Sequence, residues 1–364
     1  MSTDTALPPL HAKWMDQLLG GDIPTERAVN CFDCDRIDRG GADQVPGLDY
    51  YHPETKCCTY HPLLAGFLVG RILRDNSPNA EFARAELEKR IDSGVGVIPT
   101  AIEGSPLFKM TYGKNRKALF GRTRALRCPH YLEEQGGACA IRSSRPGICS
   151  TWFCRHANGR RGIRFWNALK DLLTSIEYEL SLWCVAQIAP DIKTVETLLG
   201  YLEKPDYIPE AGDIDGYMNP VRRGELWGGW RGRERDFYLE SSRIVEALSW
   251  NDVVSNCGPR VLLLSGLVTD AHRALCSPPR MPGRLRVGEI RLLRYGSENC
   301  FVHACDEVLE FPRGLLEALF LFDGRPVAEA RHAILKEKGL RVSDAIIERL
   351  VDFELLLPID DLPG

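Results

Sequence analysis

The chain has 364 residues, a formal net charge of −4, and a composition that is 44% hydrophobic and 26% charged. This length allows a sizeable hydrophobic core and more than one domain, and the composition is that of an ordinary soluble protein. The slightly acidic balance excludes a polycation that binds nucleic acid through its overall charge, so we expect no nucleic-acid partner.

The sequence shows neither a targeting signal nor a membrane span. The first 20 residues lack a basic segment followed by a long apolar run, which argues against a secretory signal. The apolar run from Val261 to Val268 is interrupted by Ser265 and Gly266 and is too short to cross a bilayer. We therefore expect a cytoplasmic protein without membrane contact. Thiols stay reduced in that compartment, so clustered cysteines are more typical of metal sites than of disulfides.

Apolar residues at helical spacing predict that most of the chain is helical. The predicted helices cover residues 8–20, 62–74, 80–92, 165–188, 235–249, 259–276, 312–322, 326–338 and 343–355. The apparent alternation of Leu107, Met110 and Tyr112 predicts a strand-like segment over residues 106–120.

Two stretches have the composition of loops. Residues 30–62 are rich in Asp, Gly, Pro and Tyr, so we expect a loop that is held by ligands rather than by a hydrophobic core. Residues 204–233 are rich in Gly, Pro and Trp without a clear period, which predicts a long connection or lid.

A proline-rich stretch at residues 277–283 marks a domain boundary. Beyond it, residues 286–293 and 300–304 are expected to pair as a hairpin around Gly296, and three short helices follow. The predicted fold is α+β and mostly helical. It comprises an irregular, metal-stapled cysteine-cluster domain (residues 1–164), a helical domain (165–282) and a small winged-helix-like module (283–364).

Cysteines are concentrated at the start of the chain. Eight lie in the first 154 residues: Cys31, Cys34, Cys57, Cys58, Cys128, Cys139, Cys149 and Cys154. Thiolates are soft anionic ligands for Zn²⁺ or iron–sulfur clusters, so these eight are the predicted metal ligands. Eight sulfurs suffice for two four-ligand sites, or for one site with spare ligands. Four nearby histidines could each replace a sulfur: His52, His61, His130 and His156.

The remaining five cysteines have a simpler interpretation. Buried free cysteines behave as small apolar side chains, and this interpretation suits the five that lie outside the cluster. They are Cys184, Cys257, Cys276, Cys300 and Cys305. No phosphate-binding loop and no GxSxG motif is found in the sequence.

A basic block surrounds the second half of the cluster. Residues 114–164 hold twelve Lys or Arg but only two acids, Glu133 and Glu134. The block could offset the negative charge of thiolates around a metal, form a solvated surface, or bind an anion. Arg145 and Pro146 are expected to support the site, because proline fixes φ before the turn that carries Cys149 and the guanidinium can hydrogen-bond around the ligands.

The cysteine region resembles the YkgJ-type, or CxxCxxCC, cysteine-cluster family. The resemblance rests on Cys128, on Cys139-Ala140-Ile141-Arg142, on Arg145-Pro146, and on Cys149 and Cys154. It covers roughly residues 28–156 and implies a zinc- or iron-chelating domain with eight characteristic cysteines. The first half departs from the family pattern, because 22 residues separate Cys34 from the Cys57-Cys58 pair.

The C-terminal module, residues 284–358, is similar to PqqD-like peptide-binding domains in its strand pair and in the segment from Leu315 to Leu356. The resemblance implies a peptide or protein partner, bound as an added strand at a sheet edge. A plain winged helix used for dimerisation or packing is the alternative. The acidic last helix, residues 342–355, disfavours reading of DNA.

These observations predict a metal-binding cysteine-cluster protein that holds Zn²⁺ or an iron–sulfur cluster and binds a peptide or protein through residues 283–364. One alternative is an iron-dependent enzyme that modifies a peptide or protein. The other is a zinc-stabilised adaptor or regulator without catalysis. The sequence does not identify any catalytic residue.

Overall fold

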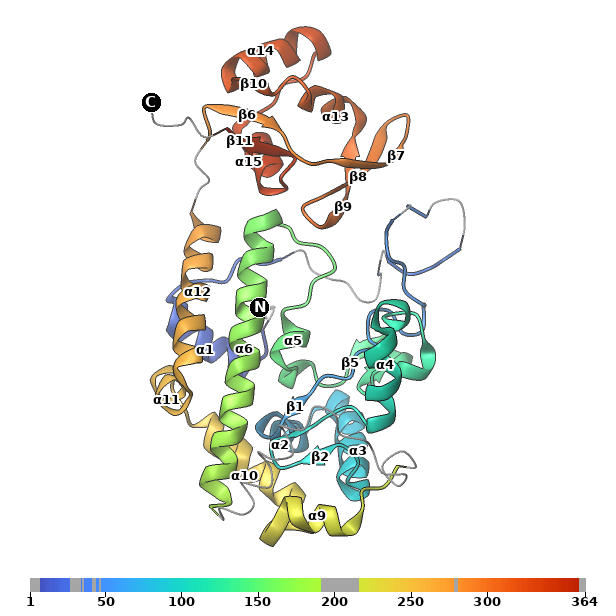
Figure 1. Ribbon diagram of the computed structural model, residues 1–364, viewed down its shortest axis with the longest axis vertical. Helices are drawn as coiled ribbons and strands as arrows, with labels where there is room; N and C mark the ends of the chain where they lie inside the picture. Colours follow the sequence, from blue (N-terminus) through green and yellow to red (C-terminus); the bar gives the residue numbers. More distant parts are fainter. Residues whose placement is uncertain are drawn as a thin grey trace.

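The computed structural model describes residues 7–26, 34, 36–40, 44–45, 47–190, 216–277 and 281–359. As predicted, the protein is α+β and mostly helical, with several small antiparallel sheets (Figure 1). The helices are α1 (Pro9–Leu19), α2 (Gly66–Arg74), α3 (Pro78–Ser93), α4 (Pro106–Leu119), α5 (Gly147–Ser150), α6 (Gly159–Ile188), α9 (Pro220–Trp227), α10 (Glu234–Glu246), α11 (Trp250–Asn256), α12 (Pro259–Cys276), α13 (Arg313–Leu319), α14 (Val327–Lys338) and α15 (Asp344–Asp352).

The strands form four small sheets. Their bounds are β1 (Leu64–Ala65), β2 (Val97–Ile98), β3 (Ala101–Ile102), β4 (Tyr131–Leu132), β5 (Ala138–Cys139), β6 (Arg284–Val287), β7 (Arg291–Tyr295), β8 (Asn299–Ala304), β9 (Glu307–Pro312), β10 (Asp323–Pro326) and β11 (Leu356–Pro358). The strand orders are β1-β3-β2, β4-β5, β10-β6-β11 and β7-β8-β9. All of these neighbours pair antiparallel.

Helix α6 runs through the middle of the N-terminal two thirds of the molecule (Figure 1). Its apolar face is fully buried along the helix at Leu169, Leu172, Leu173, Ile176 and Leu180. Helices α12 and α5 both pack on it. The helix predicted at residues 165–188 is therefore confirmed, and it begins earlier, at Gly159.

Two hydrophobic cores join segments from both sides of α6. One core combines α2, α3 and the β1-β3-β2 sheet with Val185, Trp227 and Tyr238. The other combines α1 with the apolar face of α6 and with α11 and α12. The boundary predicted at residue 164 falls inside α6, and these shared cores lie across it. Within the described ranges, no helix is long and apolar enough to cross a membrane.

The strand-like segment predicted at residues 106–120 is wrong, because this segment forms helix α4. Ser105 caps the helix by accepting a hydrogen bond from the Phe108 amide, and Pro106 occupies the first turn. The buried residues are Phe108 and Tyr112, four apart on one face, whereas Leu107 and Met110 are exposed. The apparent alternation therefore combined residues from two faces of a helix.

The connection predicted at residues 204–233 is wrong over its second half, which forms α9 and a 3-10 turn at residues 228–230. Asn219 caps α9 through a hydrogen bond from the Val221 amide. The first half of this prediction, up to residue 215, lies outside the described residues.

The C-terminal module has a hydrophobic core of its own, drawn entirely from residues 285–356. The strand predicted at residues 286–293 is divided between β6 and β7, and only β7 forms the hairpin with β8, with Tyr295 opposite Cys300. The three predicted helices form as α13, α14 and α15. The module has more strands than predicted, because β6 pairs with β10 and β11 in a second sheet rather than joining the hairpin.

The module is docked on the N-terminal end of α6 (Figure 1). Arg161 in the first turn of α6 donates two hydrogen bonds of 2.7 Å each to the Asp352 carboxylate. The same guanidinium also donates to the carbonyl oxygens of Ala274 and Ser277 at the end of α12. A lysine at this position could not form the same pair of parallel hydrogen bonds, because only the planar guanidinium matches the geometry of a carboxylate.

Replacing Arg161 with Met is expected to lower the free energy of unfolding by about 1–3 kcal/mol, since Asp352 is largely buried and would lose its partner. Chemical denaturation of the full chain measures this change. Arg243→Met is the matched control, because its pair with Glu240 is exposed to solvent and should contribute little to stability. Equal effects of the two substitutions would show that Arg161 does not hold the module to α6.

Candidate metal centre

Six of the predicted ligand cysteines come together from separate segments of the chain. The Cys57 thiol shares hydrogen bonds with the thiols of Cys58 and Cys154. Cys128 lies close enough to Cys58, Cys139 and Cys149 for their charges to raise its pKa. The six are Cys57, Cys58, Cys128, Cys139, Cys149 and Cys154, here called the cysteine cluster. All six are unpaired by disulfides.

The upstream pair is held by a tight turn. The His52 carbonyl accepts hydrogen bonds from the amides of Thr55 and Lys56 at 3.1 and 2.8 Å, and Lys56 has a positive φ of 50°. The Cys58 carbonyl then accepts from the Cys128 amide at 2.8 Å. This backbone bond joins the upstream and downstream halves of the cluster, which are 70 residues apart in sequence.

The downstream cysteines lie on short regular elements. Cys139 is on β5, opposite Tyr131 on β4. Cys149 is on α5, where the Pro146 carbonyl accepts from its amide at 2.9 Å. Pro146 precedes this helix with a φ of −65°, so the predicted supporting role of this proline agrees with its geometry.

Gly147 brings α5 into close contact with α6. A Cβ at this position would lie 2.5 Å from the Cβ of Leu173, which is closer than real contacts allow. The Gly147 amide donates to the buried Glu177 carboxylate at 2.6 Å. The Arg-Pro-Gly sequence before Cys149 therefore fixes the position of that cysteine against the longest helix.

The electrostatic environment of the thiols is mixed. Burial raises the pKa of Cys128 and of Cys149, although by surface area these residues are only half-buried. The Cys128 sulfur also accepts a hydrogen bond from the His130 amide, which lowers its pKa. The pKa of Cys58 is lowered overall, first by the hydrogen bond from Cys57 and then by the charges of Arg145 and Lys56.

Arg145 is the main cation facing the sulfurs. Its charge lowers the pKa of both Cys58 and Cys149. Its Nε atom is buried and has no hydrogen-bond partner. A buried guanidinium nitrogen beside thiols fits an anionic sulfur site, in which thiolates would accept its hydrogen bond.

The chemical nature of the six side chains suits a metal that prefers sulfur ligands, because six soft sulfur atoms lie near one another beside two cations. The positions of these side chains do not form a metal site in the structure. Within the described ranges, no group of three or more His, Cys, Asp or Glu side chains is placed so that it could hold a metal ion. Cys31 lies outside the described residues, and Cys34 is buried beside the 36–40 segment.

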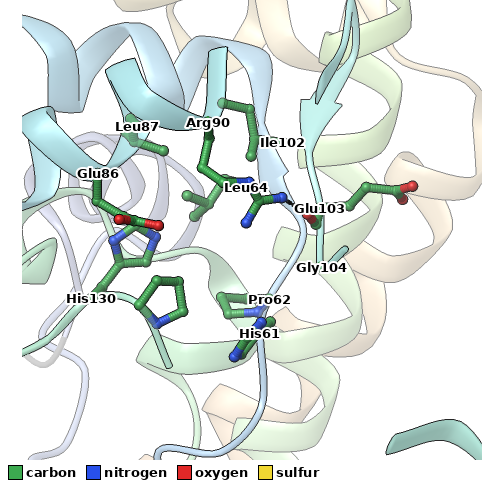
Figure 2. Close-up of a pocket in the computed structure, with 11 residues that line it drawn as sticks. His61, Pro62, Leu64, Glu86, Leu87, Arg90, Ile102, Glu103, Gly104 and His130 are labelled. Carbon is green, nitrogen blue, oxygen red and sulfur yellow. Dashed lines mark hydrogen bonds between the residues drawn. The ribbon is translucent and has the colours of Figure 1, made fainter. Parts of the chain in front are cut away.

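The four histidines predicted as extra ligands lie in three different places. His52 Nδ1 accepts a hydrogen bond from the Glu54 amide within its own turn. His156 pairs with Glu307 in the C-terminal module. His61 and His130 line a small cavity together with Glu86 and Arg90 (Figure 2).

This cavity has a volume of about 20 Å³, which is enough for a water-sized guest. Figure 2 shows that Arg90 points into it while the side chain of Glu103 points away. The Nδ1 atoms of His61 and His130 are buried and have no hydrogen-bond partner. Burial lowers the pKa of His130 to about 4, helped by the charges of Arg90 and His61, so both imidazoles of the cavity are neutral near pH 7.

Acid should destabilise the metal-free protein through His130. Its folded pKa is below the unfolded value of 6.5, so this contribution to stability is complete above pH 6.5 and is lost as the pH falls towards 4. Each pH unit in that window costs about 1.4 kcal/mol. His130→Gln should flatten the decline measured by urea denaturation between pH 7 and 5. An unchanged decline would show that another group causes the acid sensitivity.

Part of the basic block is engaged in ion pairs. Arg124 pairs with Glu54, Arg127 with Glu133, and Arg160 with both Asp306 and Glu354. These pairs reduce the charge that the block could offer to a free anion, whereas Arg145 faces the thiols of Cys58 and Cys149.

Four residues outside the predicted site residues also lie around the cluster. Lys56 and Arg36 are cations there, and Arg36 donates to the Cys154 carbonyl at 2.9 Å. Burial raises the pKa of Tyr51, and the charges of Cys154 and Cys57 raise it further. Glu177 is buried on α6 beneath α5. Two of them had a local signal in the sequence, because Lys56 directly precedes the Cys57-Cys58 pair and Tyr51 lies shortly before it.

No protein-family model matches this chain, and no curated protein and no solved structure matches it significantly.

Proposed function

We propose that this protein binds either zinc or an iron–sulfur cluster through its cysteine cluster. The observation that carries the proposal is the convergence of six cysteines from four separate segments around Arg145 and Lys56. The motif from Cys128 to Cys154 supports it through its resemblance to the YkgJ-type cysteine-cluster family. Cys31 and Cys34 complete the proposed ligand set.

The protein's own residues would prepare this site in two ways. Arg145 and Lys56 offset the negative charge of thiolates, and the His130 amide donates to the Cys128 sulfur. Short backbone bonds fix the segments that carry the sulfurs, notably the bond from the Cys128 amide to the Cys58 carbonyl. When bound, zinc would supply folding free energy, whereas an iron–sulfur centre would supply electron transfer.

Thiol titration tests the proposal. In the native, anaerobically purified protein, the cluster thiols should react slowly with a thiol reagent, and addition of a strong chelator should make them reactive. The five cysteines that follow Cys154 in the sequence provide an internal reference, because chelation should not change their reactivity. Equal reactivity of the cluster thiols with and without the chelator would contradict metal ligation.

The absorption spectrum separates the classes of function. Charge-transfer bands in the visible range would favour an iron centre and thus an iron-dependent enzyme that acts on a peptide or protein. A colourless protein with bound zinc would favour an adaptor or regulator that uses the metal for stability.

We further propose that the C-terminal module binds an extended peptide at strand β7. In the described part of this sheet, β7 lies at an edge beside β8, and Leu292 and Tyr295 on it are each 50% exposed. Arg291 and Arg294 give the strand positive charge, which would favour an acidic peptide.

Fluorescence anisotropy with a labelled peptide that alternates Val and Glu tests this proposal. Such a peptide should bind more tightly than a variant of it in which prolines replace some of the valines, because proline lacks the amide hydrogen that pairs with a neighbouring strand. Arg291→Glu should weaken binding, whereas Arg243→Glu on the distant helix α10 should not. Equal binding of both peptides would contradict strand addition.

A further inference from the structure

The C-terminal module touches the segment that directly follows the last cluster cysteine. Glu307, the first residue of β9, is only 7% exposed. Its Oε1 accepts a hydrogen bond from the His156 amide at 2.9 Å and pairs with His156 Nδ1 at 2.6 Å. A single buried carboxylate oxygen therefore binds both the backbone and the ring of a residue two positions after Cys154.

The hairpin that carries Glu307 is itself held in a fixed place. Cys305 and Asp306 form its tip with φ values of 53° and 60°. Asp306 pairs with Arg160 at 3.0 Å, and Arg160 also pairs with Glu354 at 2.6 Å. The Gly159 backbone lies against the module so closely that a Cβ there would be 2.3 Å from the Asp352 carbonyl oxygen.

Other side chains hold the same segment from different directions. The Glu26 carboxylate accepts hydrogen bonds from the Ala157 amide and from Trp166 Nε1, the latter at 3.0 Å. Arg36 donates to the Cys154 carbonyl at 2.9 Å. Residues 151–158 belong to no helix or strand. Because this segment lies in no helix or sheet that would fix it, the side chains that bind it, including Glu307, determine its position.

We propose that Glu307 is a positioning residue of the metal centre, through which the C-terminal module sets the place of Cys154. This inference rests on the proposed metal-binding function. Cys154 hydrogen-bonds with Cys57 inside the cluster, so a shift of the 154–156 segment would move one sulfur away from the others. Because coupling between two binding events is reciprocal, metal binding should also tighten the docking of the β8–β9 hairpin on residues 156–160.

The test compares Glu307→Gln with wild type in the full chain. The amide keeps the size of the side chain but removes the charge that pairs with His156. We expect the affinity for Co²⁺, measured by competition with a chelator, to fall by up to about 10-fold. This is the lower end of the range for a direct hydrogen-bond partner of a metal ligand, because Glu307 contacts His156 and not a sulfur. The thiolate-to-cobalt absorption bands should change in intensity, which a role in folding alone would not cause.

Glu310→Gln is the matched control, because Glu310 lies on the same strand, is exposed, and accepts a hydrogen bond from the Asn299 side chain at 3.0 Å. It should bind Co²⁺ as wild type does. If wild type and Glu310→Gln bind Co²⁺ and Glu307→Gln binds it with the same affinity and spectrum, the positioning role is overturned while metal binding stands. If wild type itself binds no metal, the proposed function fails and the positioning role fails with it.

A second measurement applies even if Glu307→Gln does not fold. Hydrogen exchange of the wild-type amides at residues 304–307 should slow on addition of Zn²⁺, whereas exchange in helix α14, at the far side of the module, should not change. Equal exchange at residues 304–307 with and without Zn²⁺, in protein shown to bind the metal, would overturn the coupling.

Discussion

Replacing Cys149 with serine is expected to abolish metal binding by the cysteine cluster. Cys149 is held in place by the Pro146 carbonyl, by the close contact of Gly147 with Leu173, and by the packing of α5 on α6. A serine oxygen is a hard, neutral donor and does not replace a thiolate. We expect a loss of affinity greater than the 10–100-fold typical of losing an outer hydrogen-bond partner of a ligand.

Metal content and thermal stability should fall together in Cys149→Ser, since metal binding stabilises only the folded state. Cys184→Ser is the matched control, because Cys184 is equally a free cysteine but lies in the apolar core around α6. This control should keep the full metal content. Undiminished metal content in Cys149→Ser would remove Cys149 from the ligand set.

Replacing Gly70 with alanine is expected to lower the free energy of unfolding by about 3 kcal/mol or more, which is at the upper end of overpacking substitutions. Helix α2 crosses α10 at this glycine. A Cβ there would lie 1.9 Å from the Tyr238 carbonyl oxygen and 2.7 Å from the Cβ of Ser242. The neighbouring helix cannot yield easily, because the buried Tyr238 hydroxyl donates to the carbonyl oxygens of Ile98 and Ala101.

Gly113→Ala provides the contrast for this prediction. Gly113 lies in the exposed part of α4, and a Cβ there would meet nothing within 4 Å. Because alanine favours helix and restricts the unfolded chain, this substitution should stabilise the protein by about 0.4–1 kcal/mol. Urea denaturation of both variants measures the difference. A Gly70→Ala variant as stable as wild type would mean that α2 and α10 are not in close contact.

Helices with clear start and stop signals could be predicted from the sequence. The helix predicted at residues 259–276 has the bounds of α12, and α1 ends at Gly20, which adopts the left-handed conformation typical of such a stop. The error at α4 has a physical cause. Only Phe108 and Tyr112 of this amphipathic helix are buried, so its short apolar stripe was hidden among exposed apolar residues.

The sequence indicated which cysteines lie near one another, but not which residues hold them in place. The spacing of Cys128, Cys139, Cys149 and Cys154 is visible in the sequence, and these residues do come together with the upstream pair. The partner of His156 was not visible, because Glu307 is 151 residues away and reaches it only through the docking of a separate module. Contacts between modules leave no local pattern in the chain.

The most direct test of metal binding is elemental analysis of the full-length chain purified without air. We expect at least one equivalent of zinc or iron per chain, retained through gel filtration and released by a strong chelator. Cys149→Ser should hold less metal than Cys184→Ser. A folded wild-type protein that contains neither zinc nor iron, and takes up neither on reconstitution, would show that the cysteine cluster does not bind these metals.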